Sequence, residues 1–559
     1  MAYDLKITGG TIIDGTKTPR YVGEVGIKDG RVVALGVAPE EAARTIDATG
    51  RVVAPGFVDI HTHYDAQILW DPLVSCSPWH GVTTVVMGNC GFSVAPTRAA
   101  HRDLIMRTLE NVEGMSVDAL RAGLSMDWPF ETFAEYMDVV ESQGCAVNVA
   151  PLLGHTALRM YVMGEDSVER EATPDEVAAQ RRTLREALDA GALGFATSRA
   201  VTHVGYDGKP VPSRLATPEE IIEIAGALGE VGHGVMQATV GRGLSHQEFA
   251  RIAELTGKPV SWTALLSGTP NQDYRDQLRK AAEVAGRGLP VFPQVAVQPV
   301  QFEMSWKAPF TYEALRCFNP VSKADLEGRK ALYADPEWRQ LFKEKAGKGG
   351  VIYDRWARTD ISWYPKDPTL EGRNAQELAD AAGRDPVDVV LDLALDADLE
   401  MRIVQDVINY DRDSIEELLK DPNTVIGLSD AGAHASQLCD AKYSTEFLST
   451  FVRERQDFSL EDAVHMLTQR PAQVFGITDR GTLEVGKPAD VVVFDAGAVG
   501  HLGKRRVNDL PAGADRIISD AVGIDAVVVN GTVIRRDGVD EVAPGAGLPG
   551  ELLRFGRGR

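Results

Sequence analysis

The chain alternates between short apolar runs and longer mixed stretches, and this pattern changes twice along its length. Residues 4–55 hold brief β-rich runs separated by turns such as Gly9-Gly10 and Asp29-Gly30, which is typical of β-hairpins. From about residue 56 to 478, apolar runs are separated by longer helical or loop segments, the pattern of βα units around a parallel sheet. Short strands and hairpins return after residue 479.

Eight apolar runs in the central part are predicted to be the strands of a barrel. They span residues 56–63, 82–88, 146–153, 192–198, 234–240, 259–266, 289–295 and 424–430. Eight βα units predict an α/β fold of the (β/α)8 TIM-barrel type, whose active site lies at the carboxyl ends of the strands. A Thr-Pro-Asp-Glu start predicts a helix over residues 173–190.

The two β-rich ends and the interrupted repeat predict the domain organisation. Residues 1–55 and 479–559 are expected to be the two parts of one small β-sandwich domain, and residues 56–478 the TIM-barrel domain. The interval 296–423 is too long for a single crossover, and its aromatic content indicates an inserted lid or helical subdomain. We place this insertion at about 297–420.

Composition and charge exclude several classes of partner. The 559 residues include 58 Lys and Arg against 81 Asp and Glu, a net charge of −23, so nucleic acid and anionic membranes would be repelled. The sequence shows neither a secretory signal nor an apolar run of ~18 residues, and a cytoplasmic protein is predicted. The five cysteines are scattered without a CxxC spacing, which indicates neither a disulfide framework nor a structural zinc knuckle.

The first predicted strand ends with His61 and His63. Residues i and i+2 of a strand point to the same face, so the two imidazoles converge. At the top of a barrel strand, two neutral imidazoles can bind a divalent transition metal such as Zn²⁺. A bare His-x-His pair is often structural or on the surface, but its position at the end of the first strand favours the metal site.

Asp430 and Cys90 are the other candidate ligands. Asp430 ends the eighth strand, which lies beside the first in a closed barrel, so its carboxylate can reach the same metal. There it could hold a water molecule and accept its proton as a general base; the alternative is a helix N-cap. Cys90 lies just beyond the second strand and could supply a thiolate, although a buried structural thiol is the alternative.

Several motifs carry a resemblance to a known family. They are GGTIIDG at 9–15, APGFVDIHTHYD at 54–65, GNCGFS at 88–93, GHTALR at 154–159, GALGF at 191–195 and ADVVVFD at 489–495. In this combination the chain closely resembles the amidohydrolase superfamily, specifically its D-aminoacylase (N-acyl-D-amino-acid deacylase) branch. The resemblance implies a metal-dependent hydrolase of amide or other C–N bonds, built as a barrel with a small β domain.

The sequence departs from that family at two strand ends. The family has single metal-binding histidines at the ends of strands five and six, whereas this chain has Gln237 and Trp262 or Thr263 at about those positions. Because strand four also ends without a lysine, a standard two-metal site is not expected. Three interpretations remain open: a one-metal site with Cys90 or Gln237 as a further ligand, a rebuilt pocket for another substrate such as a cyclic imide or other amide, and a non-catalytic metabolite-binding barrel.

Other strand ends carry candidates for substrate binding. His155 follows the third strand and could donate a hydrogen bond to a substrate carbonyl, or be a supporting histidine. The loop after strand four holds Arg199, His203 and Tyr206, and a guanidinium there could bind a substrate carboxylate in bidentate fashion, with a surface ion pair as the alternative. His434 either faces the site or caps the next helix.

These features predict a metal-dependent amidohydrolase that resembles N-acyl-D-amino-acid deacylases. Metal-activated water attacks the substrate carbonyl, while Asp430 takes the proton of the water and passes it to the departing nitrogen. The expected cofactor is one divalent metal ion per chain, and Zn²⁺ is the favoured ion. The expected partner is a small amide or N-acyl amino acid; the oligomeric state stays open, although barrel enzymes of this size are often dimers or larger.

Overall fold

The computed structural model describes residues 2–125, 127–269, 272–309, 311–313, 315–348, 355–545 and 547–556. The chain divides into two compact units. The first comprises Met1–Leu265, Gln277–Val297 and Glu416–Arg559, and the second comprises Leu266–Asp276 and Gln298–Ile415. The first unit holds a barrel and a sheet built from both chain ends, whereas the second has a small sheet and helices of its own.

Eight parallel strands form the centre of the first unit. They are β6 (Phe57–Asp59), β7 (Val82–Met87), β8 (Asn148–Gly154), β9 (Gly194–Ser198), β10 (Val235–Thr239), β11 (Val260–Thr263), β12 (Val291–Val295) and β16 (Val425–Ile426). The sheet order is β16-β12-β11-β10-β9-β8-β7-β6. A parallel bridge joins Thr62 to Ala431, and His63 N donates to Ala431 O at 2.7 Å. These contacts link the first and last strand ends, so the predicted TIM barrel is confirmed.

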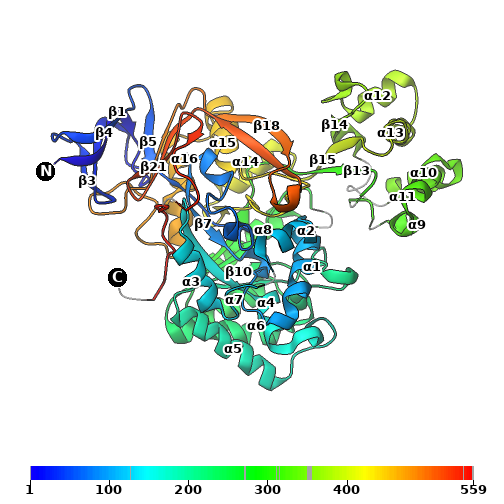
Figure 1. The fold of residues 1–559 in the computed structure, drawn as a ribbon, viewed down its shortest axis with the longest axis horizontal. Helices are drawn as coiled ribbons and strands as arrows, with labels where there is room; N and C mark the ends of the chain where they lie inside the picture. The colour runs from blue at the N-terminus through cyan, green and yellow to red at the C-terminus, as the bar shows by residue number, and fades with distance from the viewer. Residues whose placement is uncertain are drawn as a thin grey trace. The chain divides into compact units, whose positions relative to one another are not determined.

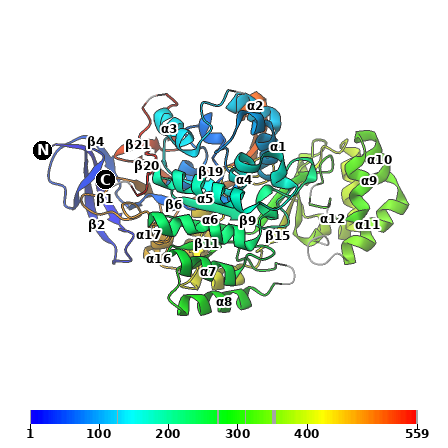
Figure 2. The same cartoon turned by 90° about the horizontal axis from the view of Figure 1, so that it is seen from below.

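Helices cover the outside of the barrel, as α5, α6 and α7 do in Figure 2. The α-helices of this unit are α1 (Arg102–Glu113), α2 (Val117–Leu124), α3 (Phe133–Gln143), α4 (His155–Met163), α5 (Pro174–Asp189), α6 (Pro218–Val231), α7 (His246–Thr256), α15 (Tyr443–Glu446), α16 (Leu460–Leu467) and α17 (Gln469–Val474). The residues of α8 (Tyr274–Gly286) and α14 (Arg412–Lys420) are divided between the two units. Thr173 caps α5 through a capping box with Glu176, which confirms the predicted helix start. None of the described helices is both long and apolar enough to cross a membrane.

Strands from both ends of the chain form one nine-stranded sheet, seen in Figure 1 where the blue strands and β21 lie together. These strands are β1 (Tyr3–Ile12), β2 (Tyr21–Lys28), β3 (Arg31–Gly36), β4 (Ala42–Asp47), β5 (Val52–Pro55), β17 (Val491–Phe494), β20 (Ile524–Val529), β21 (Thr532–Arg536) and β22 (Val539–Asp540). Buried Ile7, Val25 and Val491 belong to one apolar core, so strands from both ends of the chain pack together. Strands β18 (Gly500–Val507) and β19 (Arg516–Val522) form a separate antiparallel pair.

The expected turn at Gly9-Gly10 is wrong, because β1 runs through both glycines. The register of β1 against β2 shifts between Ile7 and Gly10, which is the mark of a β-bulge. A Cβ at Gly10 would lie only 2.4 Å from Cγ2 of Val53. Glycine is therefore needed here for close strand packing. The turn at Asp29-Gly30, in contrast, joins β2 and β3 as an antiparallel hairpin, as predicted.

The second unit combines a three-stranded sheet with short helices around an aromatic core. Its strands β13 (Val300–Ser305), β14 (Thr359–Trp363) and β15 (Arg402–Ile408) are antiparallel in the order β13-β15-β14. Its helices are α9 (Asn319–Lys323), α10 (Leu326–Ala334), α11 (Pro336–Lys348), α12 (Ala375–Ala382) and α13 (Pro386–Asp396). Trp306 is fully buried, stacked on Tyr312 and edge-on to Tyr333. This core gives the segment between β12 and β16 its own hydrophobic centre.

Candidate metal centre

Four side chains from the ends of the first, second and eighth barrel strands converge on one point. The ligand atoms of His61, His63 and Cys90 lie within 4.8 Å of one another, and all three residues are buried. Oδ1 of Asp430 is 3.1 Å from Nε2 of His61 and 3.8 Å from Nε2 of His63. Sγ of Cys90 is 3.4 Å from Nε2 of His61. The structure therefore brings together all four side chains that the sequence placed at a metal.

Glycines shape the tight loop that carries Cys90. Gly88 has a φ of +87°, and a Cβ there would lie 2.1 Å from the carbonyl oxygen of Leu152. Cys90 itself has a φ of +55° and Asp430 a φ of +44°. Left-handed backbone is uncommon for residues other than glycine and concentrates at functional sites, where the surrounding structure holds it. Two of the four converging residues thus sit on strained backbone.

Hydrogen bonds fix the Cys90 loop against its neighbouring strands. The Asn89 side-chain amide donates to the carbonyl of Thr62 at 3.2 Å and to that of Val86 at 2.9 Å. The backbone N–H of Cys90 donates to Oε1 of Gln237 at 2.7 Å. Thr62 separates the two histidines, so Asn89 joins the thiol-bearing loop directly to the strand that supplies the imidazoles.

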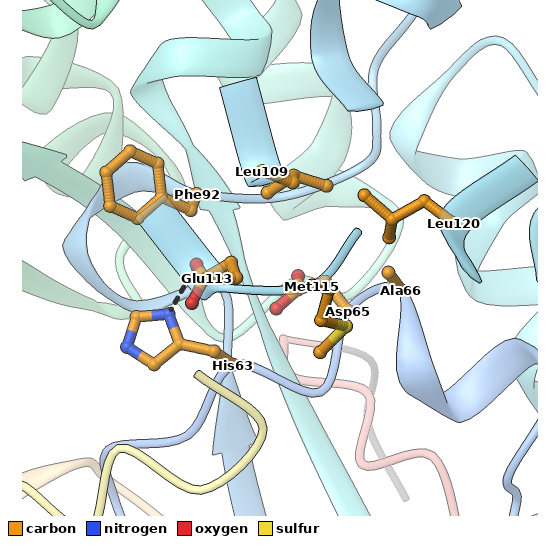
Figure 3. Close-up of a pocket in the computed structure, with 8 residues that line it drawn as sticks. All are labelled: His63, Asp65, Ala66, Phe92, Leu109, Glu113, Met115 and Leu120. Carbon is orange, nitrogen blue, oxygen red and sulfur yellow. Dashed lines mark ion pairs between the residues drawn. The ribbon is translucent and has the colours of Figure 1, made fainter. Parts of the chain in front are cut away.

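The far nitrogens of both imidazoles face oxygen acceptors. Nδ1 of His61 is 2.7 Å from Oε1 of Gln294, and Nδ1 of His63 is 3.2 Å from Oε1 of Glu113, the ion pair drawn in Figure 3. At His61, the Gln294 acceptor at Nδ1 favours the ring proton there and leaves Nε2 available to a metal, the arrangement typical of metal-binding histidines. Both Nε2 atoms face the Asp430 carboxylate, so positive charge at this point, from a metal ion or from protons on the rings, balances the cluster.

The electrostatics of the cluster agree with this requirement. Burial lowers the pKa of His61, but the neighbouring Cys90 and Asp430 outweigh that effect and raise it to about 10. Burial raises the pKa of the Cys90 thiol, but His61 and His63 outweigh it and lower the pKa to about 6. Burial is likewise outweighed at Asp430, whose pKa the two histidines hold well below its usual range. Thiolate, carboxylate and imidazole are ligands of Zn²⁺, so the residues present fit a divalent transition metal.

Gln237, a candidate metal or substrate ligand, accepts a hydrogen bond from the backbone of Cys90. Its amide oxygen accepts the Cys90 N–H, and its Nε2 lies 3.4 Å from Oγ1 of Thr263. Both ends of the amide are thus occupied by protein atoms. Trp262, the other residue near the missing histidines, packs against His246 and Phe249 of α7, on the helical layer outside the barrel.

His155, a candidate to bind substrate or to support the site, is buried at the start of α4 and faces β9 and α6. Its Nδ1 is 2.8 Å from Oγ1 of Thr197, and its Nε2 faces the Glu220 carboxylate at 3.6 Å. The ring packs edge-on against Phe195. Burial lowers the pKa of His155, and both ring nitrogens face protein groups.

The guanidinium of Arg199, a candidate to bind a substrate carboxylate, donates hydrogen bonds to backbone carbonyls. Its Nε donates to the carbonyl of Arg242 at 3.0 Å, and its Nη1 donates to the carbonyls of Arg214, at 2.8 Å, and Ala216. These bonds hold the loops after β9 and β10 together. The planar fork of the guanidinium is therefore used for loop structure.

Tyr206, another candidate for substrate binding, is buried in the loop after β9. Its ring is 5% exposed and lies beside two cations, 5.6 Å from the Arg107 guanidinium and 5.5 Å from Nζ of Lys209. Burial raises the pKa of its hydroxyl. These contacts make Tyr206 part of the packing between its loop and α1.

His203 and His434 lie near the four converging residues. The His203 ring packs against Phe92 at 5.1 Å, and Phe92 packs in turn against His63 at 6.4 Å. Burial, with smaller effects from His434 and His63, lowers the pKa of His203 to about 3, which keeps its ring neutral. His434 has a φ of +49°, and its charge reaches His203. Both stay candidates for substrate binding.

Sequence reasoning missed Glu113 and Gln294, which orient the two histidines. Glu113 is the last residue of α1 and is 5% exposed; a carboxylate opposes the helix dipole at that end, which is a usable signal. Gln294 is a polar residue within an apolar strand, and its Nε2 donates to Oγ of Ser261 at 3.0 Å. The cavity in Figure 3, about 10 Å³, lies between Glu113, His63 and Asp65, so it has room for at most a water molecule.

A closed TIM barrel with imidazoles, a thiol and a carboxylate converging at its strand ends defines the class of metal-dependent barrel hydrolases. Residues 44–535 match the amidohydrolase family, and the chain belongs to this family. It is therefore a hydrolase acting on carbon–nitrogen bonds other than peptide bonds.

Characterised relatives and solved structures share nearly the whole length of the chain. It is 31% identical to the D-aminoacylase of Alcaligenes xylosoxydans xylosoxydans, over 95% of this chain and 94% of that protein. It is 29% identical to the N-acyl-D-glutamate deacylase of the same organism, over 99% and 96%. The structure of N-acyl-D-glutamate deacylase from Bordetella bronchiseptica, complexed with zinc and a phosphonate inhibitor, has a TM-score of 0.67 at 26% identity and covers 99% of this chain and 100% of that one. The predicted D-aminoacylase branch is confirmed.

Proposed function

We propose that the protein is a zinc-dependent deacylase of N-acyl-D-amino acids that works with one metal ion per chain. The observation that carries this proposal is the buried cluster of His61, His63 and Cys90, whose ligand atoms lie within 4.8 Å of one another. Oδ1 of Asp430 lies beside it, 3.1 Å from Nε2 of His61 and 3.8 Å from Nε2 of His63. The relatives support the substrate class, since they include a D-aminoacylase and an N-acyl-D-glutamate deacylase. Zinc is supported by the zinc complex of the Bordetella enzyme.

The four converging side chains would hold the ion. When bound, it would polarise the substrate carbonyl and make a water molecule acidic enough to attack at neutral pH. Glu113 and Gln294 keep the two imidazoles in the tautomer that leaves Nε2 free. Gln237 and Asn89 hold the Cys90 loop in place, so the protein fixes the ligand positions before substrate arrives.

Asp430 is proposed to move the proton. Its carboxylate is ionised at neutral pH, because the two histidines hold its pKa well below the usual range despite burial. It can therefore accept the proton of the attacking water and return it to the departing nitrogen as the C–N bond breaks. Its left-handed backbone sets the direction of the carboxylate from the end of β16.

His203 is proposed to donate a hydrogen bond to the substrate. The Ser198 hydroxyl accepts the N–H of Ala200 at 3.2 Å and lies 2.7 Å from Nδ1 of His203. If the hydroxyl hydrogen goes to Nδ1, the neutral ring carries its proton on Nε2. A neutral imidazole N–H suits an oxygen that becomes negative as the carbonyl is attacked.

Two arginines favour an anionic substrate. Arg214 donates to the carbonyl of His203 at 3.0 Å, and Arg242 lies close enough to Arg199 that its charge helps to lower the pKa of that guanidinium, after burial itself. Neither Arg214 nor Arg242 forms an ion pair with a carboxylate in the described parts of the chain. In a protein of net charge −23, such uncompensated cations can hold the carboxylate of an N-acyl amino acid.

Metal analysis and a substrate panel test the proposal. Freshly purified protein should contain about one zinc ion per chain, and chelation should abolish hydrolysis until zinc is returned. The panel should include N-acyl-D- and N-acyl-L-amino acids, simple amides and cyclic imides. Turnover of cyclic imides alone would favour the rebuilt pocket, and metal-free protein without turnover would favour a metabolite-binding barrel; either result contradicts the proposal.

Replacing Asp430 tests the proton-transfer role. Asp430→Asn keeps the shape of the side chain but cannot accept a proton, so we expect turnover to fall at least 100-fold with the circular dichroism and melting temperature retained. Asp127→Asn, at an exposed position, is the matched control and should leave turnover unchanged. Wild-type activity in Asp430→Asn would exclude Asp430 as the base.

A further inference from the structure

Two cysteines outside the metal centre lie side by side, although they are far apart in sequence. Cys76 belongs to the loop after β6 and precedes the 3-10 turn Ser77–His80. Cys439 belongs to the segment between β16 and α15. Their Sγ atoms are 3.8 Å apart across a separation of 363 residues, and the residues are only 4% and 6% exposed.

The two thiols line a polar cavity rather than an apolar core. The cavity measures about 30 Å³, and Tyr64, Asp430 and Arg516 also line it. This volume admits one or two molecules of the size of water, and hydrogen peroxide is of comparable size. Arg516 donates to the carbonyl of Ser75 at 3.0 Å, which places a guanidinium beside the backbone of Cys76.

The surroundings of the pair affect the two thiols in opposite ways, favouring the thiolate at Cys76 and the protonated thiol at Cys439. A hydrogen bond with Cys439, aided by His80, lowers the pKa of Cys76 well below its usual value despite burial. The hydrogen bond with Cys76, together with burial, raises the pKa of Cys439 well above its usual value. Among the described residues no thiol faces Cys145 in this way, and burial raises its pKa to about 12. Since the thiolate is the reactive form of cysteine, the chain contains an unreactive internal control.

We propose that Cys76 and Cys439 form a reversible disulfide when the protein meets a peroxide. The Cys76 thiolate attacks the peroxide O–O bond, which breaks to give a sulfenic acid at Cys76 and one water molecule once the leaving oxygen takes up a proton. The Cys439 thiol then attacks the Cys76 sulfur, the S–S bond forms and a second water leaves. The two sulfurs lose two electrons in total, and the peroxide gains them.

The disulfide between Cys76 and Cys439 requires only a small movement of the two side chains. The sulfurs must approach from 3.8 Å to the ~2.05 Å of a disulfide, with both side chains on loop segments. The disulfide would join the loop that follows His61 and His63 to the segment that begins at Asp430. It would thus covalently connect two sides of the metal centre without using any of its ligands.

Thiol counting and peptide mapping test the proposal on the zinc-loaded protein. Brief treatment with hydrogen peroxide should reduce the thiols titratable in denaturant from five, the number of cysteines in the chain, to three. Mass spectrometry should find a peptide pair joined through Cys76 and Cys439, and dithiothreitol should restore all five thiols. Cys145→Ser, the matched control, should form the same joined peptide.

Two variants separate the steps. Cys439→Ser should stop the reaction at the sulfenic acid of Cys76, which dimedone labels, whereas Cys76→Ser should abolish both products. Peptide mapping of the oxidised wild-type protein tests for the Cys76–Cys439 disulfide even where a variant folds poorly. Five thiols after treatment, or oxidation confined to Cys90 with no joined peptide, would overturn the proposal.

Discussion

Replacing Glu113 by glutamine should weaken zinc binding about tenfold. Oε1 of Glu113 lies 3.2 Å from Nδ1 of His63, and both side chains are 6% exposed, so solvent screens their interaction weakly. Glutamine retains an oxygen acceptor but removes the charge. A hydrogen bond to a charged group is worth ~1.5–3 kcal/mol and a neutral one ~0.5–1.5; a difference of ~1.4 kcal/mol is tenfold in affinity. Loss of such supporting carboxylates typically costs ~10–100-fold.

Competition with a chromogenic chelator at constant pH measures this effect directly. Glu110→Gln, an exposed change in the same helix, is the matched control and should bind zinc like the wild type. Circular dichroism and melting temperature establish that Glu113→Gln remains folded. A zinc dissociation constant within twofold of wild type in the folded variant would refute the idea that Glu113 orients His63 toward a metal.

Three further substitutions test other parts of the argument. Arg214→Gln should raise KM about tenfold for an N-acyl amino acid but leave it unchanged for an uncharged amide, because only the N-acyl amino acid has a carboxylate that the Arg214 guanidinium can bind. Burial raises the pKa of Glu220, but His155 and Arg159 outweigh burial and lower the pKa to about 2. The lowered pKa corresponds to ~3 kcal/mol of folding stability above pH ~4.5, and this stability is lost as the pH falls toward 2. Urea unfolding of Glu220→Gln should therefore differ most from wild type at neutral pH, with a difference that shrinks in acid. Trp306→Ala should destabilise the second unit by ~3–5 kcal/mol in thermal unfolding followed by circular dichroism, because it empties a fully buried site.

The barrel could be predicted because its strands are short apolar runs separated by helical segments, a pattern visible without tertiary contacts. The predicted elements differ from the structure where tertiary packing overrides the local sequence pattern. Gly9-Gly10 has the composition of a turn but serves a bulge, because Val53 approaches the backbone there. The eighth strand is shorter than its apolar run, and only Val425–Ile426 is assigned as strand; the bridge at Ala431 continues the contact with the first strand.

The four converging residues could be predicted because barrel closure places the ends of the first, second and eighth strands together. The supporting residues could not. A glutamine at a strand end could bind a metal or substrate, or it could support a neighbouring loop. At Gln237 only the fold shows that the Cys90 N–H lies within hydrogen-bond distance of the side chain. Arg199 has the chemistry of a carboxylate clamp, but carbonyls of distant loops occupy it. Sequence supplies the chemical type of a side chain, while its partners depend on the fold.

The missing histidines of strands five and six are replaced by a neutral network that supports the first metal position. Gln237 binds the Cys90 loop and approaches Thr263, while Gln294 contacts His61 and donates to Ser261. None of these four supporting side chains carries a charge to balance a second divalent cation, and the polar atoms of both amides are already engaged. Gln237, at a position where the family has a histidine, therefore fixes the loop that carries the thiol, while Gln294 of the seventh strand fixes one imidazole. The absence of two family ligands is thus compatible with an organised one-metal centre.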